Sequence, residues 1–213
     1  MNSSELKLRE EMCRWGASLF QRGLSAGSSG NLSARLDDGF LVTPTNACLG
    51  FLDPAHLSKL DPAGNLVSGD PPTKESPLHL AFYAARDGAG GVVHLHSSHA
   101  TALSCLDASD IHNCVPALTP YMVMRVGEVA LVPYVRPGSS AISEHIRALA
   151  PRHSALLLAN HGPVVSAATF RDAVFAAEEL EEAAKLVLLT RGLAARRLTS
   201  SEIDELRTAF SLR

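Results

Sequence analysis

The chain has 213 residues, of which 46% are hydrophobic, and its formal net charge is −3. This length and composition predict one domain over residues 1–213, with enough apolar side chains for a single core. The slightly acidic balance, without any lysine- or arginine-rich run, argues against nucleic acid or an anionic membrane as a partner. No apolar run is long enough to span a bilayer, and no signal peptide is recognisable. Four scattered cysteines without a C-x-x-C pair favour a reducing cytoplasm.

The first third of the chain predicts one helix followed by two hairpins. Apolar residues recur at helical spacing over residues 4–22, and glycines follow them. Two pairs of short apolar runs come next, each joined by turn-forming residues: 32–36 with 40–43, and 57–60 with 66–68. Consecutive hairpins indicate a largely antiparallel sheet.

The rest of the chain mixes helices and strands without regular alternation. Glu75 opens a predicted helix, in whose first turn Pro77 is tolerated. The predicted segments are helices over 75–86, 99–107, 139–150 and 169–190, and strands over 92–96, 129–134, 155–159 and 163–166. This pattern predicts an α/β layered domain in which helices flank a central, mostly antiparallel sheet.

Histidines form the most informative motif. His94 and His96 are two residues apart on a predicted strand, so both point to the same face. A His-x-His pair alone is common in structural roles. His161, within Asn160-His161-Gly162, and Glu75 would complete the three-histidine, one-carboxylate set of a catalytic divalent metal site. Such a set favours zinc and also suits manganese, cobalt or iron.

Three polar turns could form a phosphate cradle. They are Gly27-Ser28-Ser29-Gly30-Asn31, Thr43-Pro44-Thr45-Asn46 and Thr73-Lys74. Hydroxyl and backbone N–H donors bind phosphate, glycine lets the backbone approach it, and Lys74 adds a positive charge. Each segment taken alone could be an ordinary turn. The chain has neither a G-x-x-x-x-G-K-[ST] loop nor a G-x-G-x-x-G fingerprint, which argues against nucleoside triphosphates and dinucleotides.

The order and spacing of these motifs resemble the class II aldolase/adducin family, typified by fuculose-1-phosphate aldolase. The resemblance implies a homotetramer with active sites at subunit interfaces. It implies that His94, His96 and His161 hold the metal with Glu75, which can leave it to act as acid or base. It assigns Tyr121 as a proton donor to a neighbouring subunit's site. The residues that it assigns to the substrate phosphate are Gly30, Asn31, Thr45, Asn46, Thr73 and Lys74.

Four segments resemble one subgroup of that family, the 3-oxo-tetronate 4-phosphate decarboxylases. They are residues 72–75, 134–138, 158–165 and 176–182, and Thr73-Lys74 stands where the aldolases usually have Ser-Ser. The resemblance implies release of carbon dioxide and formation of dihydroxyacetone phosphate. An aldolase of the fuculose-1-phosphate type or a ribulose-5-phosphate 4-epimerase is the alternative. A metal-free, adducin-like module is disfavoured because all the histidines are kept. The acidic run 178–182 is interpreted as a solvated helix face.

A common mechanism fits both enzyme alternatives. A divalent metal would stabilise the enediolate that is left when the adjacent C–C bond breaks. Glu75 is the favoured donor of the proton to carbon, with Tyr121 or water as alternatives. Lys74 could hold either the phosphate or the carboxylate, and Arg125 or Arg136 is a second candidate for either anion. His79 is expected to pack in the core or to support the metal site.

Overall fold

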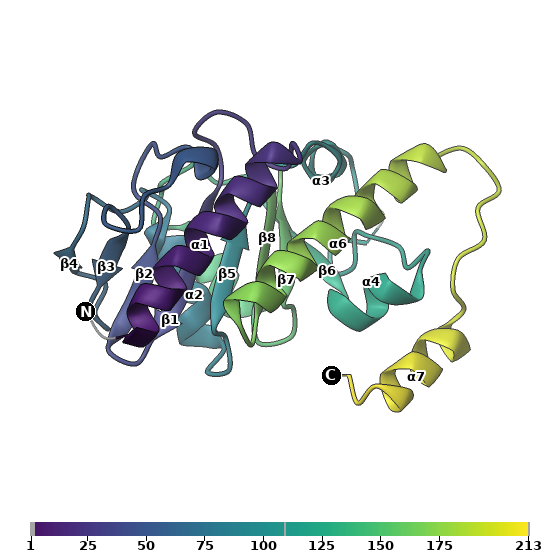
Figure 1. Ribbon diagram of the computed structural model, residues 1–213. Helices are drawn as coiled ribbons and strands as arrows, with labels where there is room; N and C mark the ends of the chain where they lie inside the picture. The colour runs from purple at the N-terminus through teal and green to yellow at the C-terminus, as the bar shows by residue number, and fades with distance from the viewer. Residues whose placement is uncertain (1–2, 109, 213) are drawn as a thin grey trace.

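The computed structural model describes residues 3–108 and 110–212. Its centre is an eight-stranded sheet with the order β4-β3-β2-β1-β5-β8-β7-β6 (Figure 1). Every pairing is antiparallel except that of β6 with β7. The mostly antiparallel sheet expected from the sequence is therefore confirmed. The strands are β1 Asn31–Leu36, β2 Gly39–Val42, β3 Ser58–Leu60, β4 Leu66–Ser68, β5 Gly91–His94, β6 Val129–Val132, β7 Ala155–Leu158 and β8 Gly162–Ala167.

Helices cover both faces of this sheet, as expected. In Figure 1, α1 (Ser3–Gln21) and α6 (Phe170–Leu189) cross the front, while α2 (Ser76–Ala85) lies behind, where it packs beside α5 (Ile142–Leu149). Two apolar clusters match these layers, one formed with α1 and α6 and the other with α2 and α5. The shorter helices are α3 Ser98–Ser104, α4 Pro120–Arg125, α7 Ser200–Ala209 and the 3-10 turn η1 Leu49–Phe51. Within the described ranges, no helix combines the length and hydropathy needed to cross a membrane.

Three of these segments, η1, α4 and α7, were not predicted from the sequence. The start signals of the two α-helices are nevertheless present. The Thr119 hydroxyl accepts a hydrogen bond from the backbone of Met122, and Pro120 occupies the first turn of α4. Thr199 and Glu202 form a reciprocal capping box at α7. Both helices, of six and ten residues, are shorter than the window of about 11–18 residues over which apolar periodicity predicts a helix.

Strand β5 carries the first metal-ligand candidate and ends at His94, two residues before the predicted boundary. Val93 and Leu95 join the core beneath α1 and α6, whereas Val92 joins the core beneath α2 and α5. His94 therefore faces α2, because alternate residues of a strand share a face. The Leu95 amide still donates to the Pro163 carbonyl at 3.2 Å, which keeps the segment beyond β5 against β8.

Gly162 begins β8 and brings the preceding loop, which carries His161, against the end of β5. Its φ angle is +152°, a conformation that residues with a side chain rarely adopt. A Cβ atom at this position would lie 2.5 Å from the Leu95 carbonyl oxygen and 3.2 Å from the Thr101 Oγ1. The close approach of these two segments therefore requires a residue without a side chain.

We expect Gly162→Ala to lower the free energy of unfolding by about 1–3 kcal/mol, because it combines backbone strain with a backbone clash. Gly88→Ala is the matched control, since no atom lies within 4 Å of its added Cβ. The control should stay within about 0.5 kcal/mol of the parent protein. Urea unfolding of all three proteins measures the difference, and equal midpoints and slopes would contradict the required close approach.

Candidate metal centre and phosphate cradle

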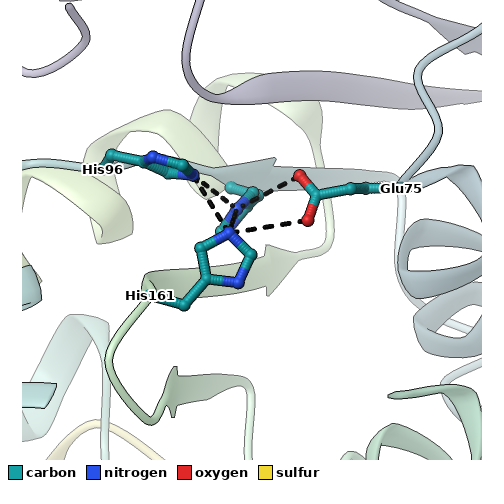
Figure 2. Close-up of side chains that lie close together, drawn as sticks. Glu75, His96 and His161 are labelled. Atoms are coloured by element: carbon teal, nitrogen blue, oxygen red, sulfur yellow. Dashed lines mark hydrogen bonds and ion pairs between the residues drawn. The ribbon is translucent and has the colours of Figure 1, made fainter. Parts of the chain in front are cut away.

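Four side chains converge on one point between β5, the β7–β8 loop and the start of α2. His94 is the last residue of β5, His96 follows it by two positions, and His161 immediately precedes β8. Glu75 is the N-cap residue of α2. Each of the four offers a ligand atom, and these atoms all lie within 4.8 Å of one another. Figure 2 shows the imidazole rings of His96 and His161 and the Glu75 carboxylate directed toward a common centre.

The three imidazoles face one another through their Nε2 atoms. The Nε2–Nε2 distances are 3.2 Å for His94–His96, 3.3 Å for His94–His161 and 3.1 Å for His96–His161. The Nδ1 atom of His94 lies 2.8 Å from the Pro163 carbonyl oxygen, which can only accept, so Nδ1 carries the proton. Burial lowers the pKa of His94 to about 4, against the opposing effect of the Glu75 carboxylate. Neutral His94 therefore directs the lone pair of Nε2 toward the centre.

This donor set fits a divalent metal ion. Burial also lowers the pKa of His96, and the neighbouring His161 lowers it further, so the cluster disfavours protonated rings. Unprotonated nitrogens this close together repel one another unless a cation lies between them. Nitrogen and carboxylate ligands, with the first ring fixed by a carbonyl acceptor behind it, are the usual composition of a divalent metal site. The cluster therefore indicates a divalent metal.

Glu75 completes the cluster with both carboxylate oxygens. Its Oε2 lies 3.4 Å from the His94 Nε2, and its Oε1 lies 3.5 Å from the His161 Nε2. Oε2 also accepts a 2.8 Å hydrogen bond from the Asn31 Nδ2. Burial by itself raises the pKa of Glu75, but nearby His94 and the Asn31 hydrogen bond outweigh it, and the net shift is downward. The carboxylate is thus held ionised, either as a ligand or as a proton acceptor.

A cavity of about 200 Å³ adjoins the metal cluster. Gly30, at the start of this cavity wall, has a φ of +78°, and a Cβ there would lie 3.0 Å from the His94 carbonyl oxygen. Glu75 and His96 belong both to the metal cluster and to the lining of this cavity. All six residues that the resemblance assigns to a substrate phosphate line the cavity: Gly30, Asn31, Thr45, Asn46, Thr73 and Lys74.

Of the other candidate residues, Arg136 lies beside the metal cluster, whereas Tyr121 and Arg125 lie on α4. Arg136 lines a recess together with Lys74, Glu75 and His161. Tyr121 lies on α4 with 56% of its surface exposed, and it lines none of the cavities around the metal cluster that the described residues form. The guanidinium of Arg125 lies over the Phe175 ring, 5.9 Å from its centroid, in a separate cavity beside α6.

Sequence reasoning missed Glu181. The acidic run 178–182 was interpreted as a solvated face, but Glu181 is only 8% exposed, so this interpretation is wrong for that residue. Its carboxylate accepts hydrogen bonds from the backbone amides of His99 and Ala100 at the start of α3. It therefore anchors the segment that follows His96. Its spacing from buried Val174 was the available signal, because seven residues return to the same helix face.

Comparisons with known proteins agree with this geometry. Residues 10–188 match the model of the Class II Aldolase and Adducin N-terminal domain. The 3-oxo-tetronate 4-phosphate decarboxylase of Pectobacterium atrosepticum is 50% identical over 205 residues, which cover 96% of this chain and 94% of that protein. The L-fuculose phosphate aldolase of Escherichia coli is 35% identical over 170 residues, 79% of this chain and 76% of that one.

A solved structure gives the same result for the fold. The crystal structure of YgbL from Escherichia coli superimposes with a TM-score of 0.94 at 49% identity, covering 96% of this chain and 100% of that one. The family model, the sequence similarity over nearly the whole chain and the fold all agree with the site, in which three histidines and a glutamate adjoin a polar cavity. The chain belongs to the class II aldolase and adducin family.

Proposed function

We propose that this protein is a metal-dependent carboxy-lyase that removes carbon dioxide from a 3-oxo-tetronate 4-phosphate and forms dihydroxyacetone phosphate. The observation that carries the choice of reaction is the 50% identity, over nearly the whole of both chains, to a decarboxylase of that name. Similarity to the fuculose phosphate aldolase is lower and covers less of the chain. Aldehyde cleavage and 4-epimerisation of sugar phosphates remain the alternatives, since they would use the same metal cluster and cradle.

We assign His94, His96, His161 and Glu75 as the ligands of a single zinc ion per subunit, with manganese, cobalt or iron as substitutes. When bound, the metal would supply Lewis-acid stabilisation for the negative charge that develops on the substrate carbonyl oxygen. The ionised state of Glu75 and the free lone pair of His94 support this assignment.

We assign the cavity of about 200 Å³ beside the metal cluster, the cradle, as the binding site of the substrate phosphate. The hydroxyls of Thr45 and Thr73 and the charge of Lys74 border the same cavity, which supports an anion there. Asn31 has a second role beside phosphate binding, because its side chain is also bonded to Glu75 and His79. One N–H of its amide is left for the substrate.

The chemistry follows from the position of the ketone beta to the carboxylate. The electron pair of the bond between the carboxylate carbon and C2 moves to form a C2–C3 double bond, and the carbonyl oxygen takes up the negative charge. A proton must then reach C2. We assign this transfer to Glu75, which lies at the boundary between cradle and metal cluster: its ionised carboxylate first takes a proton from a water molecule and then passes that proton to C2, with Tyr121 as the alternative donor.

We assign Arg136 as the residue that binds the substrate carboxylate. It lines a recess together with Lys74, Glu75 and His161, and this recess shares Lys74 and Glu75 with the cradle. Arg125 is not used, because its guanidinium lies on Phe175 in a separate cavity. Arg136 is exposed in the described chain, which leaves its guanidinium free to meet an incoming anion.

We further propose that Tyr121 acts in a neighbouring subunit of a homotetramer. Its ring is exposed on α4 and lines neither cavity beside its own metal cluster, which supports a role outside its own subunit. A cytoplasmic location is proposed as well, in keeping with four free cysteine thiols.

The reaction itself is tested by measuring carbon dioxide from synthetic 3-oxo-tetronate 4-phosphate with the metal-loaded protein. We expect carbon dioxide and dihydroxyacetone phosphate in equal amounts. Fuculose 1-phosphate and ribulose 5-phosphate are assayed in parallel for aldehyde release and epimerisation. Carbon dioxide no higher than in a metal-stripped control would overturn the decarboxylase assignment, and aldehyde release in its place would favour the aldolase.

The ligand assignment is tested by His94→Ala and His161→Ala. Each variant should lose bound metal and turnover together, because a site built from four protein ligands holds its metal much more weakly after losing one of its histidines. Metal content is measured by mass spectrometry after gel filtration. His112→Ala, at an exposed position outside the cluster, is the control. Parent-level metal content in both ligand variants would refute the assignment.

Arg136→Gln tests the carboxylate subsite. Loss of a charge-assisted hydrogen bond costs about 1.5–3 kcal/mol, so kcat/KM should fall roughly 10- to 150-fold. Dihydroxyacetone phosphate, which lacks the carboxylate, should inhibit the variant and the parent equally. An equal weakening of this inhibitor would instead assign Arg136 to the phosphate.

A further inference from the structure

A ladder of buried polar side chains lies between α2 and β1, directly behind Glu75. Tyr83 and His79 lie one turn apart on α2, and Ser33 and Asn31 lie two residues apart on β1. The links are 2.8 Å from the Tyr83 hydroxyl to Ser33 Oγ, 2.7 Å from Ser33 Oγ to His79 Nδ1, and 2.5 Å from His79 Nε2 to Asn31 Oδ1. The last link is the 2.8 Å bond from Asn31 Nδ2 to Glu75.

Only one direction of donation satisfies every link. Ionised Glu75 can only accept, so Asn31 must present its NH₂ group to Glu75 and its carbonyl oxygen to His79. The Nε2 atom of His79 must then donate. Burial lowers the pKa of His79 to about 3, so the ring is neutral and its Nδ1 is an acceptor. Ser33 therefore donates to His79 and accepts from Tyr83, whose pKa burial raises.

Helix packing alone does not explain this ladder. His79 and Ser33 are fully buried, and Tyr83 and Asn31 are 3% and 5% exposed. Buried polar groups have a desolvation cost that apolar side chains of similar size avoid. Their neighbours in the same layer, such as Phe82 and Val92, are apolar. A continuous set of satisfied hydrogen bonds that ends on a candidate metal ligand indicates a role in positioning that ligand.

We propose that Tyr83, Ser33 and His79 form a one-way chain of hydrogen bonds that locks the amide of Asn31 and thereby sets the orientation of the Glu75 carboxylate. His79 is the decisive positioning residue, because its N–H selects between the two nearly isosteric orientations of Asn31. The flipped amide would direct its oxygen at Glu75 and repel it. The inference rests on the proposed role of Glu75 at the metal centre.

The chain has a chemical consequence for Glu75. Its Oε2 is held by Asn31, while Oε1 approaches only the His161 Nε2, at 3.5 Å, among the contacts described for the carboxylate. The two oxygens are therefore distinguished: Oε2 is fixed and Oε1 is the one available to take or give a proton. Asn31 also lines the cradle, so the same amide connects substrate binding with carboxylate orientation.

The test compares His79→Leu with His79→Gln. The Gln side chain can place its NH₂ near the position of the imidazole Nε2 and still donate to Asn31, whereas Leu cannot. We expect Leu to weaken zinc binding about 10- to 100-fold, as other losses of supporting groups do, and Gln to restore most of it. Zinc affinity is measured by chelator competition, and circular dichroism and thermal unfolding verify the fold of each variant.

Two further variants keep the test decisive. Tyr83→Phe removes only the far end of the chain and should change zinc affinity less than about threefold, because the donor to Asn31 remains. Ser33→Ala, which removes the donor to His79 Nδ1, should give an intermediate loss and replaces His79→Leu if that variant does not fold. The visible spectrum of the cobalt-loaded proteins reports the ligand set independently of turnover.

A double variant that also changes Glu75 distinguishes a positioning role of His79 from a general effect on protein stability. In a Glu75→Gln background, His79→Leu should cause no further loss of zinc affinity, because the two changes act through one carboxylate. Equal losses in Leu and Gln variants, or the same loss with and without Glu75, would overturn the proposed chain. Zinc binding that survives His94→Ala would instead contradict the metal centre itself, so the two failures are distinguishable.

Discussion

The mutual approach of three imidazole nitrogens at the end of β5 is the constraint on which the site depends. Nitrogen lone pairs 3.1–3.3 Å apart are unfavourable neighbours without a cation, and burial of His94 prevents protonation from supplying the charge. The fold maintains this arrangement through groups behind each ring. Pro163 fixes the His94 ring, Gly162 permits the close approach of the His161 loop, and Glu181 anchors the helix that follows His96.

The sequence predicted the parts of this site that local periodicity determines. The His-x-His spacing placed two rings on one side of a strand, and Val93 and Leu95 on the opposite side confirmed that alternation. The antiparallel sheet followed from turn residues between short apolar runs. What local patterns could not supply were the long-range partners: the carbonyl behind His94 comes from residue 163, and the carboxylate that caps α3 comes from residue 181. Neither contact has a periodic signal across that separation.

Backbone proximity couples the cradle to the metal cluster. Gly30 approaches the His94 carbonyl so closely that a Cβ would lie 3.0 Å from it, and Asn31, the next residue, pairs with His94 in the sheet. The cradle thus begins on the strand next to the one that supplies the first metal-ligand candidate. Because Asn31 and His94 belong to one sheet register, strand spacing sets the distance between the Asn31 end of the cavity and the first metal-ligand candidate.

The two ends of the site differ in exposure, and this difference matters because negative charge moves from one end to the other during decarboxylation. The substrate's negative charge begins on a carboxylate and ends on the former carbonyl oxygen when carbon dioxide departs. A site accelerates this step only if it stabilises the second position more than the first. Arg136, assigned to the carboxylate, is exposed, where water screens its charge, whereas His94 is fully buried. Interactions at the buried end act in a lower effective dielectric and are stronger. With the proposed assignment of Arg136, the weaker interaction is therefore at the carboxylate and the stronger one is where the charge lies after bond cleavage.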